Sequence, residues 1–145
     1  MIALTSDHAG FEYKEKLKKL LDELQQPYRD FGPSTNAQTD YPDWAHIAAE
    51  AVSTGECDHG IFICGTGIGM SIVANKHKGV RAAACESVSA ARLARQHNHA
   101  NVLTIGERLI GWEAVIDIVK TFLSASFEGG RHGERVEKIH SLTKL

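Results

Sequence analysis

Short apolar runs alternate with amphipathic helical patterns along the whole chain, and this alternation constrains the fold most strongly. Strands are predicted at Ile2–Ser6, Tyr28–Phe31, Gly60–Cys64, Val80–Cys85 and Val102–Ile105. Apolar residues at helical spacing and capping residues predict the helices Phe11–Leu24, Asp43–Val52, Gly67–Lys76, Ser87–Gln96, Gly111–Leu123 and one from Arg131 to just before Leu145. The alternation predicts an α/β fold, a doubly wound three-layer sandwich in which helices cover both faces of a parallel sheet.

Length, charge and cysteine content restrict the class of protein further. The 145 residues fit a single domain, 1–145, without internal repeats. Sixteen Lys and Arg against eighteen Asp and Glu give a net charge of −2, which argues against binding to nucleic acid or anionic lipid. No apolar run is long enough for a membrane span, and the N-terminal segment does not resemble a signal peptide. The odd number of cysteines favours reduced thiols, so we expect a soluble cytoplasmic protein.

A glycine-rich turn, residues 65–69, directly follows Cys64 at the end of a predicted strand. Ligands bind at the carboxyl ends of strands in such sheets. Met70 excludes the dinucleotide fingerprint, the Walker motif and a cysteine-phosphatase loop, because these need Gly, Lys or Arg respectively at that position. What remains is a thiol beside free backbone N–H groups and a helix N-terminus, which binds anions and favours a thiolate. The alternative for Cys64 is simple core packing, the role expected of Cys57 and Cys85.

Histidines and Asp7 supply further candidates. His8, His97 and His99 are better suited to proton transfer than to metal binding, because the chain has neither a C-x-x-C nor an H-E-x-x-H motif. Asp7 either caps the first helix or contacts a sugar hydroxyl or an imidazole. The other histidines are expected to be ordinary surface or satisfied residues: His46, His59, His77, His132 and His140.

Arg131 and Arg135 are spaced i, i+4 on the last predicted helix, directly after two glycines. This spacing points both guanidinium groups the same way. They form either a solvated face or a phosphate site, which Arg108 at the end of another predicted strand could join.

At this point the sequence resembles a known family, the ribose-5-phosphate isomerase B and galactose-6-phosphate isomerase group. The resemblance covers essentially the whole chain, in five blocks: SDHAGF (6–11), TDYPDWA (39–45), GIFICGTGIGMSIVANK (60–76), ARQHNHANVLTIGERLIG (94–111) and FEGGRHGERVEKI (127–139). It implies a Rossmann-like sandwich with a five-stranded parallel sheet. It also implies a homodimer or tetramer that needs no metal or organic cofactor and whose active sites are shared between subunits.

The same resemblance assigns roles to individual residues. Cys64 would remove the proton at C2 of a sugar phosphate, and His97 would be the acid that opens the sugar ring. The implied substrate-binding residues are Asp7, His8, Tyr41, Gly65, Thr66, Gly67, Ile68, Gly69, Asn98, Arg108, Arg131 and Arg135. One branch of the family has a glutamate base where Met70 stands here, which places this chain in the thiol branch. His99 departs from the acidic or amide residue of many members.

The reaction implied is aldose–ketose isomerisation through an enediolate, with ribose 5-phosphate and ribulose 5-phosphate as the expected pair. Three alternatives remain open at this stage. The substrate could be another sugar phosphate, namely allose or galactose 6-phosphate or a tetrose 4-phosphate. The chain could be a non-catalytic sugar-phosphate-binding sensor or partner subunit. It could also be a phosphoryl carrier that forms phosphocysteine on Cys64.

Overall fold

The computed structural model describes all 145 residues and contains one five-stranded parallel sheet of order β2-β1-β3-β5-β4. The strands are β1 (Ile2–Ser6), β2 (Tyr28–Asp30), β3 (His59–Cys64), β4 (Ala82–Ala84) and β5 (Val102–Gly106). β1, β3 and β5 occupy the centre of the sheet, and nearly all of their residues are buried. Parallel strands covered on both faces require such continuous apolar runs.

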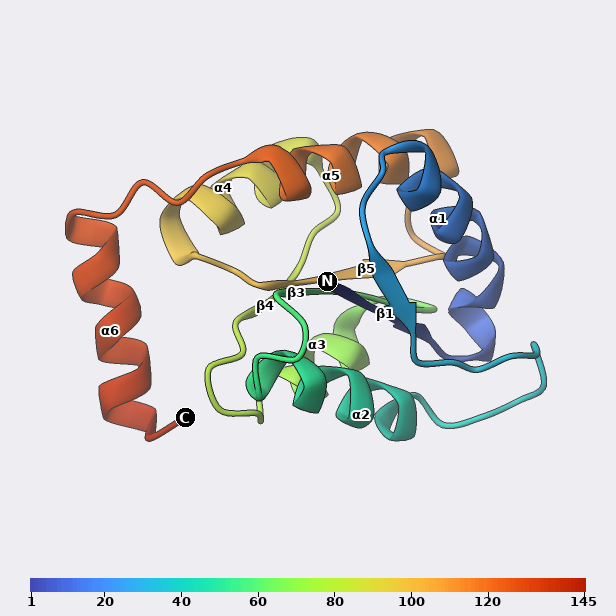
Figure 1. Cartoon of the computed structure of the whole chain (residues 1–145), viewed down its shortest axis with the longest axis horizontal. Coiled ribbons are helices and arrows are strands. Elements are labelled where there is room, and N and C mark those ends of the chain that lie inside the picture. The colour runs from blue at the N-terminus through green and yellow to red at the C-terminus, as the bar shows by residue number, and fades with distance from the viewer.

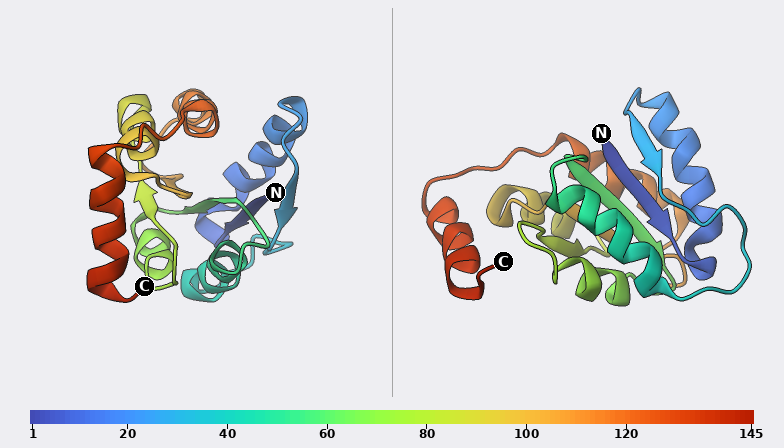
Figure 2. Two further views of the ribbon diagram at one scale, coloured as in Figure 1. Left: turned by 60° about the vertical axis from the view of Figure 1, so that its left-hand side comes forward. Right: turned by 60° about the horizontal axis from the view of Figure 1, so that its bottom comes forward.

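Helices cover both faces of the sheet (Figures 1 and 2). They are η1 (His8–Gly10), α1 (Phe11–Glu23), α2 (Tyr41–Ser53), α3 (Ile68–Ala74), α4 (Val88–Asn98), α5 (Trp112–Ser124) and α6 (Arg131–Thr143). α1, α4 and α5 pack on one face, α2 and α3 on the other. α6 stands apart at one end of the molecule, after an extended segment (Figure 1). The predicted α/β sandwich is confirmed.

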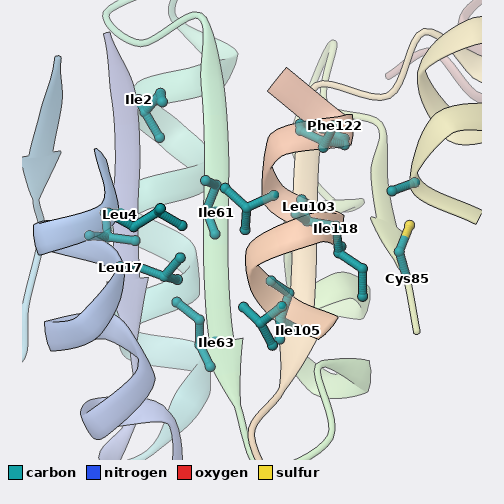
Figure 3. Packing of buried hydrophobic residues seen from close by; sticks show 14 of the residues in the cluster. Ile2, Leu4, Leu17, Ile61, Ile63, Cys85, Leu103, Ile105, Ile118 and Phe122 are labelled. Carbon is teal, nitrogen blue, oxygen red and sulfur yellow. The ribbon is translucent and has the colours of Figure 1, made fainter. Parts of the chain in front are cut away.

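Two hydrophobic clusters form the core, one on each side of the sheet. The larger contains Leu4, Ile61 and Leu103 from the strands, packed against residues such as Leu17 and Ile118 from the helices (Figure 3). The smaller is dominated by alanines of α2, and it also contains Met70 and Cys64. Small side chains let α2 approach the sheet closely, while the larger apolar residues fill the other side.

The predicted elements are observed with small shifts at their ends. β4 is shorter than the predicted Val80–Cys85, because Arg81 N donates to the side chain of Asn101 and only Ala82–Ala84 pair with β5. α2 begins at Tyr41, two residues before the predicted start, with a proline in its first turn. The predicted cap of α4 is present, since Ser87 Oγ accepts from Ala90 N at 3.0 Å.

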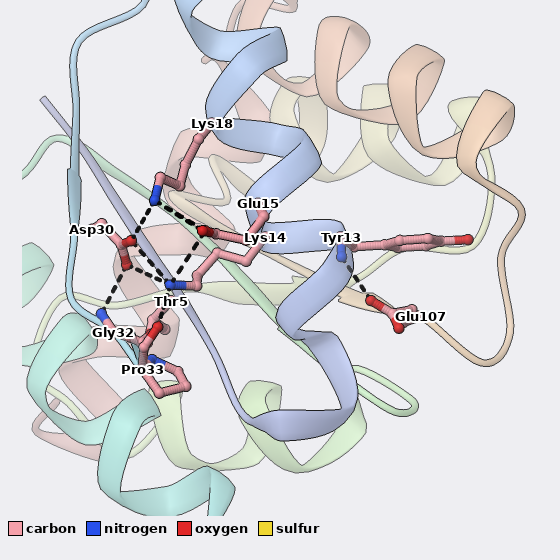
Figure 4. Close-up of polar contacts among 9 residues, drawn as sticks. All are labelled: Thr5, Tyr13, Lys14, Glu15, Lys18, Asp30, Gly32, Pro33 and Glu107. Atoms are coloured by element: carbon pink, nitrogen blue, oxygen red, sulfur yellow. Dashed lines mark hydrogen bonds and ion pairs between the residues drawn. The ribbon is translucent and has the colours of Figure 1, made fainter. Parts of the chain in front are cut away.

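A buried lysine anchors the edge of the sheet near the pocket described below (Figure 4). Lys14 is 1% exposed, and its Nζ donates to both Asp30 carboxylate oxygens, at 2.8 and 3.0 Å, and to Pro33 O at 2.6 Å. Asp30 also accepts from Gly32 N, and Thr5 Oγ1 donates to Gly32 O. These bonds fix the start of the long connection between β2 and α2.

No helix combines the length and the apolar character that crossing a membrane would require. Cys57, Cys64 and Cys85 are all unpaired and buried.

Candidate active site

A pocket of about 190 Å³ opens at the carboxyl edge of the sheet, where β1 and β3 end. The chain leaves these two adjacent strands toward opposite faces of the sheet, which is the switch point where ligands bind in doubly wound folds. The lining residues come from three connections and from the start of α2: Asp7, His8, Ala9, Tyr41, Cys64, Gly65, Thr66, Gly69 and Arg108. The tertiary structure therefore brings together seven of the predicted binding residues and Cys64.

Cys64 is the last residue of β3, and it is only 4% exposed although it lines the pocket. Its Sγ accepts a hydrogen bond from Gly67 N at 3.1 Å, and its carbonyl accepts from Glu107 N at 2.9 Å. A backbone N–H directed at sulfur stabilises the thiolate form. The other cysteines differ: burial raises the pKa of the Cys85 thiol to about 11, and burial is also the main reason that the pKa of Cys57 is raised. Their predicted packing role agrees with these surroundings.

The glycine turn depends on positions that have no room for a side chain. Gly67 has a φ of +77°, and a Cβ there would lie 2.9 Å from the backbone carbon of Ile105. A Cβ on Gly69 would lie 2.6 Å from the ring of Tyr41. Ile68, predicted to bind substrate, does not line the pocket, and its side chain is 54% exposed. Gly67 does not line the pocket either, and its backbone N–H donates to the sulfur of Cys64.

Asp7 and His8 follow β1 on the other side of the pocket. Asp7 is buried, and its Oδ1 accepts from Gly10 N at 3.1 Å, so it caps η1 while it also lines the pocket. His8 Nδ1 lies 3.2 Å from Thr39 N and 3.1 Å from Thr39 O. This contact ties the imidazole to the connection that Lys14 anchors further upstream.

Arg108 lies in the tight turn after β5. Its N donates to Gly65 O at 3.0 Å, and a Cβ on Gly65 would lie 3.0 Å from its Nη1, so the guanidinium group covers the glycine turn. The turn is braced by α1, because Tyr13 N donates to Glu107 Oε1 at 2.7 Å (Figure 4) and Tyr13 OH donates to Ile110 O at 2.7 Å.

Four predicted site residues lie elsewhere in the same chain. His97 and Asn98 end α4, and Arg131 and Arg135 begin α6. α4 returns the chain to the start of β5, which pairs with the start of β3, whereas Cys64 ends β3. Gly60, which pairs with the start of β5, and Cys64 are four residues apart along β3, a distance of roughly 13 Å. In Figure 1, α6 accordingly lies on the side opposite the connection between β2 and α2.

Around His97 the structure reveals two residues that sequence reasoning missed. The rings of His97 and His132 stack with centroids 4.2 Å apart and an interplanar angle of 7°. Glu128 lies beside both, with its carboxylate oxygens 4.0 Å from His97 Nε2 and 3.7 Å from His132 Nε2. The motif FEGGRH contains both residues, but no local periodicity relates it to His97.

These three side chains could be considered as metal ligands, because their ligand atoms lie within 4.8 Å of one another. The stacked geometry argues against one ion. Lone pairs of imidazole nitrogens lie in the ring plane, and the planes of these two rings are nearly parallel. The lone pairs of the two rings therefore do not converge on one ion at the roughly 2.0–2.1 Å that zinc requires.

A thiol, an imidazole and a guanidinium group thus line a small pocket at this switch point, which suits a small polar or anionic ligand. The model of the Ribose/Galactose Isomerase family matches residues 2–139. The chain belongs to this family, and with it to the aldose–ketose isomerases, so the predicted membership is confirmed.

Among its relatives, the ribose-5-phosphate isomerase B of Escherichia coli is 46% identical over 141 residues, which are 97% of this chain and 95% of that protein. The solved ribose-5-phosphate isomerase B of Clostridium thermocellum has a TM-score of 0.97 at 48% identity, covering 99% of this chain and 97% of that one. The Mycoplasma genitalium enzyme with bound ribulose 5-phosphate has a TM-score of 0.95 at 44% identity, covering 99% of this chain and 95% of that one.

Proposed function

We propose that this isomerase interconverts ribose 5-phosphate and ribulose 5-phosphate, with Cys64 as the base that moves a proton between C2 and C1. The observation that carries the proposal is the Cys64 thiol in the pocket wall, with Gly67 N donating to its sulfur at 3.1 Å. A five-carbon phosphate is favoured because the Mycoplasma genitalium relative was solved with ribulose 5-phosphate.

Met70 supports the thiol as base. It occupies the position at which the other branch of the family carries a glutamate, and in this structure it is fully buried in the core between α2, α3 and the sheet. A methionine cannot accept a proton at neutral pH. Among the residues that line the pocket, the thiolate therefore fits the task of removing a carbon-bound proton.

The reaction places negative charge on a former carbonyl oxygen when the enediolate forms. Preorganised N–H donors near that oxygen lower the barrier, and losing one such donor typically costs about 3–4 kcal/mol. The open side of the glycine turn offers backbone N–H groups at Gly65, Thr66 and Gly69 in the pocket wall. We assign the stabilisation of the enediolate to these amides.

The phosphate and the ring-opening acid require residues that the pocket of one chain lacks. The pocket wall contains one arginine, Arg108, and it contains none of His97, Asn98, Arg131 and Arg135. Three large apolar side chains near the pocket are about half exposed, Ile68, Ile72 and Leu109, as expected of a surface that another chain covers. We infer that a second copy supplies His97, Asn98, Arg131 and Arg135, and that the arginines join Arg108 in holding the phosphate.

The test is proton exchange from C2 of a panel of aldose phosphates in heavy water, which reports both the reaction and the preferred chain length. We expect ribose 5-phosphate to exchange fastest and Cys64→Ala to lower exchange by at least about 1,000-fold while it retains ligand binding. Cys85→Ala, a buried thiol outside the pocket, is the matched control and should retain activity. Near-normal exchange by Cys64→Ala would overturn the mechanism, and preference for a tetrose or hexose phosphate would overturn the substrate. Phosphocysteine detected by mass would favour the carrier alternative.

A further inference from the structure

His97 and His99, at the end of α4, each stack on a ring from the start of α6 or from the segment before it. His97 stacks on His132, and His99 stacks on Phe127 with centroids 4.3 Å apart and an interplanar angle of 2°. Between these rings, Glu128 N donates to Gln96 O at 3.0 Å. The end of α4 and the start of α6 are therefore joined by two aromatic stacks and one backbone hydrogen bond.

The Glu128 carboxylate faces both imidazoles of the first stack. Its Oε1 lies 4.0 Å from His97 Nε2, and its Oε2 lies 3.7 Å from His132 Nε2. Both distances are within ion-pair range but longer than a direct hydrogen bond. The carboxylate therefore acts on the two rings mainly through its negative charge.

The two rings differ in their access to solvent. The side chain of His97 is 38% exposed, whereas that of His132 is 10% exposed. Burial, followed by the positive charges of His97, Arg131 and Arg135, lowers the pKa of His132, and Glu128 offsets this only in part. His132 is thus the shielded ring of the pair, and His97 is the ring that a substrate could reach.

We propose that Glu128 and His132 are positioning residues for His97: the stack holds its ring in place, and the carboxylate sets a negative charge beside it, so that the ring serves as the acid that opens the sugar ring. This proposal rests on the proposed function, in which His97 serves the pocket of a second copy. The proton passes from His97 to the ring oxygen as the bond between that oxygen and C1 breaks. The anomeric hydroxyl releases its own proton to solvent water as the C1 aldehyde forms, so one proton enters and one leaves the sugar and the ring opens without redox change.

Two assays separate ring opening from proton abstraction. Isomerisation of ribose 5-phosphate requires a closed sugar to open, whereas proton exchange at C1 of ribulose 5-phosphate starts from an open chain. We expect Glu128→Gln and His132→Leu to lower kcat for the aldose by about 10–100-fold and C1 exchange by less than about 3-fold. His132→Phe keeps an aromatic ring in the stack and should recover part of the His132→Leu loss. Glu137→Gln is the charge-matched control for Glu128→Gln, because it removes an exposed carboxylate from α6.

Equal losses in both assays would overturn the proposal, because a merely structural role would affect the two reactions alike. Rates for Glu128→Gln equal to those of Glu137→Gln would also overturn it. Circular dichroism and thermal unfolding of Glu128→Gln, a half-exposed position, establish that the variant is folded. Failure of the proposed function is distinguishable, since the unmodified protein would then show neither isomerisation nor exchange.

Discussion

The two groups of candidate site residues are held in place in different ways. Around Cys64, strand pairing and backbone hydrogen bonds from Gly67, Glu107 and Arg108 leave almost no freedom. Around His97, an extended segment carries α6, and ring stacks hold its start while Leu142 near its end remains 79% exposed. The difference teaches that Cys64 is built into the sheet, whereas His97 lies at the end of α4 and the two arginines lie on α6, which follows an extended segment. If the proposed roles hold, the base is fixed by the sheet, and the acid and the phosphate-binding arginines belong to a region that could reach another copy.

Complementation between variants would test this division with the largest effect. Cys64→Ala and Arg135→Ala are each expected to lose most activity, by about 1,000-fold in kcat and by about 10–100-fold in kcat/KM respectively. If each site combines Cys64 of one copy with Arg135 of another, a refolded equimolar mixture should regain roughly a quarter of normal activity, because half of the dimers are mixed and each mixed dimer holds one intact site.

The measurement is the rate with ribose 5-phosphate before and after mixing, and the control mixes Cys64→Ala with Cys85→Ala, of which only the second is active. A mixture of Cys64→Ala and Arg135→Ala that stays as inactive as its components would show that the two regions do not share a site.

The anchoring of the connection between β2 and α2, which leads to Tyr41 in the pocket wall, can be tested at Lys14. Lys14→Met would leave Asp30 without its main partner and release Pro33 O from a buried cation (Figure 4). Because Asp30 is partly exposed, we expect the free energy of unfolding to fall by about 3 kcal/mol, at the low end for a broken buried pair.

Urea denaturation measures this loss, and Lys18→Met is the matched control. Lys18 also pairs with Asp30 but is 30% exposed, so its loss should cost only about 0.5 kcal/mol. Equal destabilisation by both variants would contradict the anchoring role of Lys14.

The smallest expected effect is a pH dependence of the same contact. Burial acts to raise the pKa of Asp30, but hydrogen bonds from Lys14, Gly32 N and Lys18 outweigh it and leave the pKa below its ordinary value. A lowered pKa contributes stability above the unfolded value, near pH 4, and that stability is lost as the pH falls through the folded value. Between pH 5 and pH 2, the difference in unfolding free energy between the unmodified protein and Asp30→Asn should therefore shrink, as urea midpoints would show. A constant difference would contradict this origin.

Much of the candidate site followed from local patterns in the sequence. The strand ending at Cys64 and the glycine turn were predictable because continuous apolar runs and consecutive glycines act locally. The grouping of Asp7, Cys64 and Arg108 followed from parallel pairing, which brings the carboxyl ends of all strands to one edge. Glu128 and His132 escaped prediction because their partner His97 lies more than 30 residues away, on another helix.

The sequence by itself determined the order of strands and helices and the thiol at the end of β3, because hydrophobic periodicity and backbone propensities act over a few residues. Only the tertiary structure decided that Cys64 receives the Gly67 amide, that Lys14 lies buried against Asp30, and that His97 stacks on His132 far from the thiol. Such contacts depend on how elements distant in sequence pack against one another, and packing is fixed by the whole core rather than by any one segment.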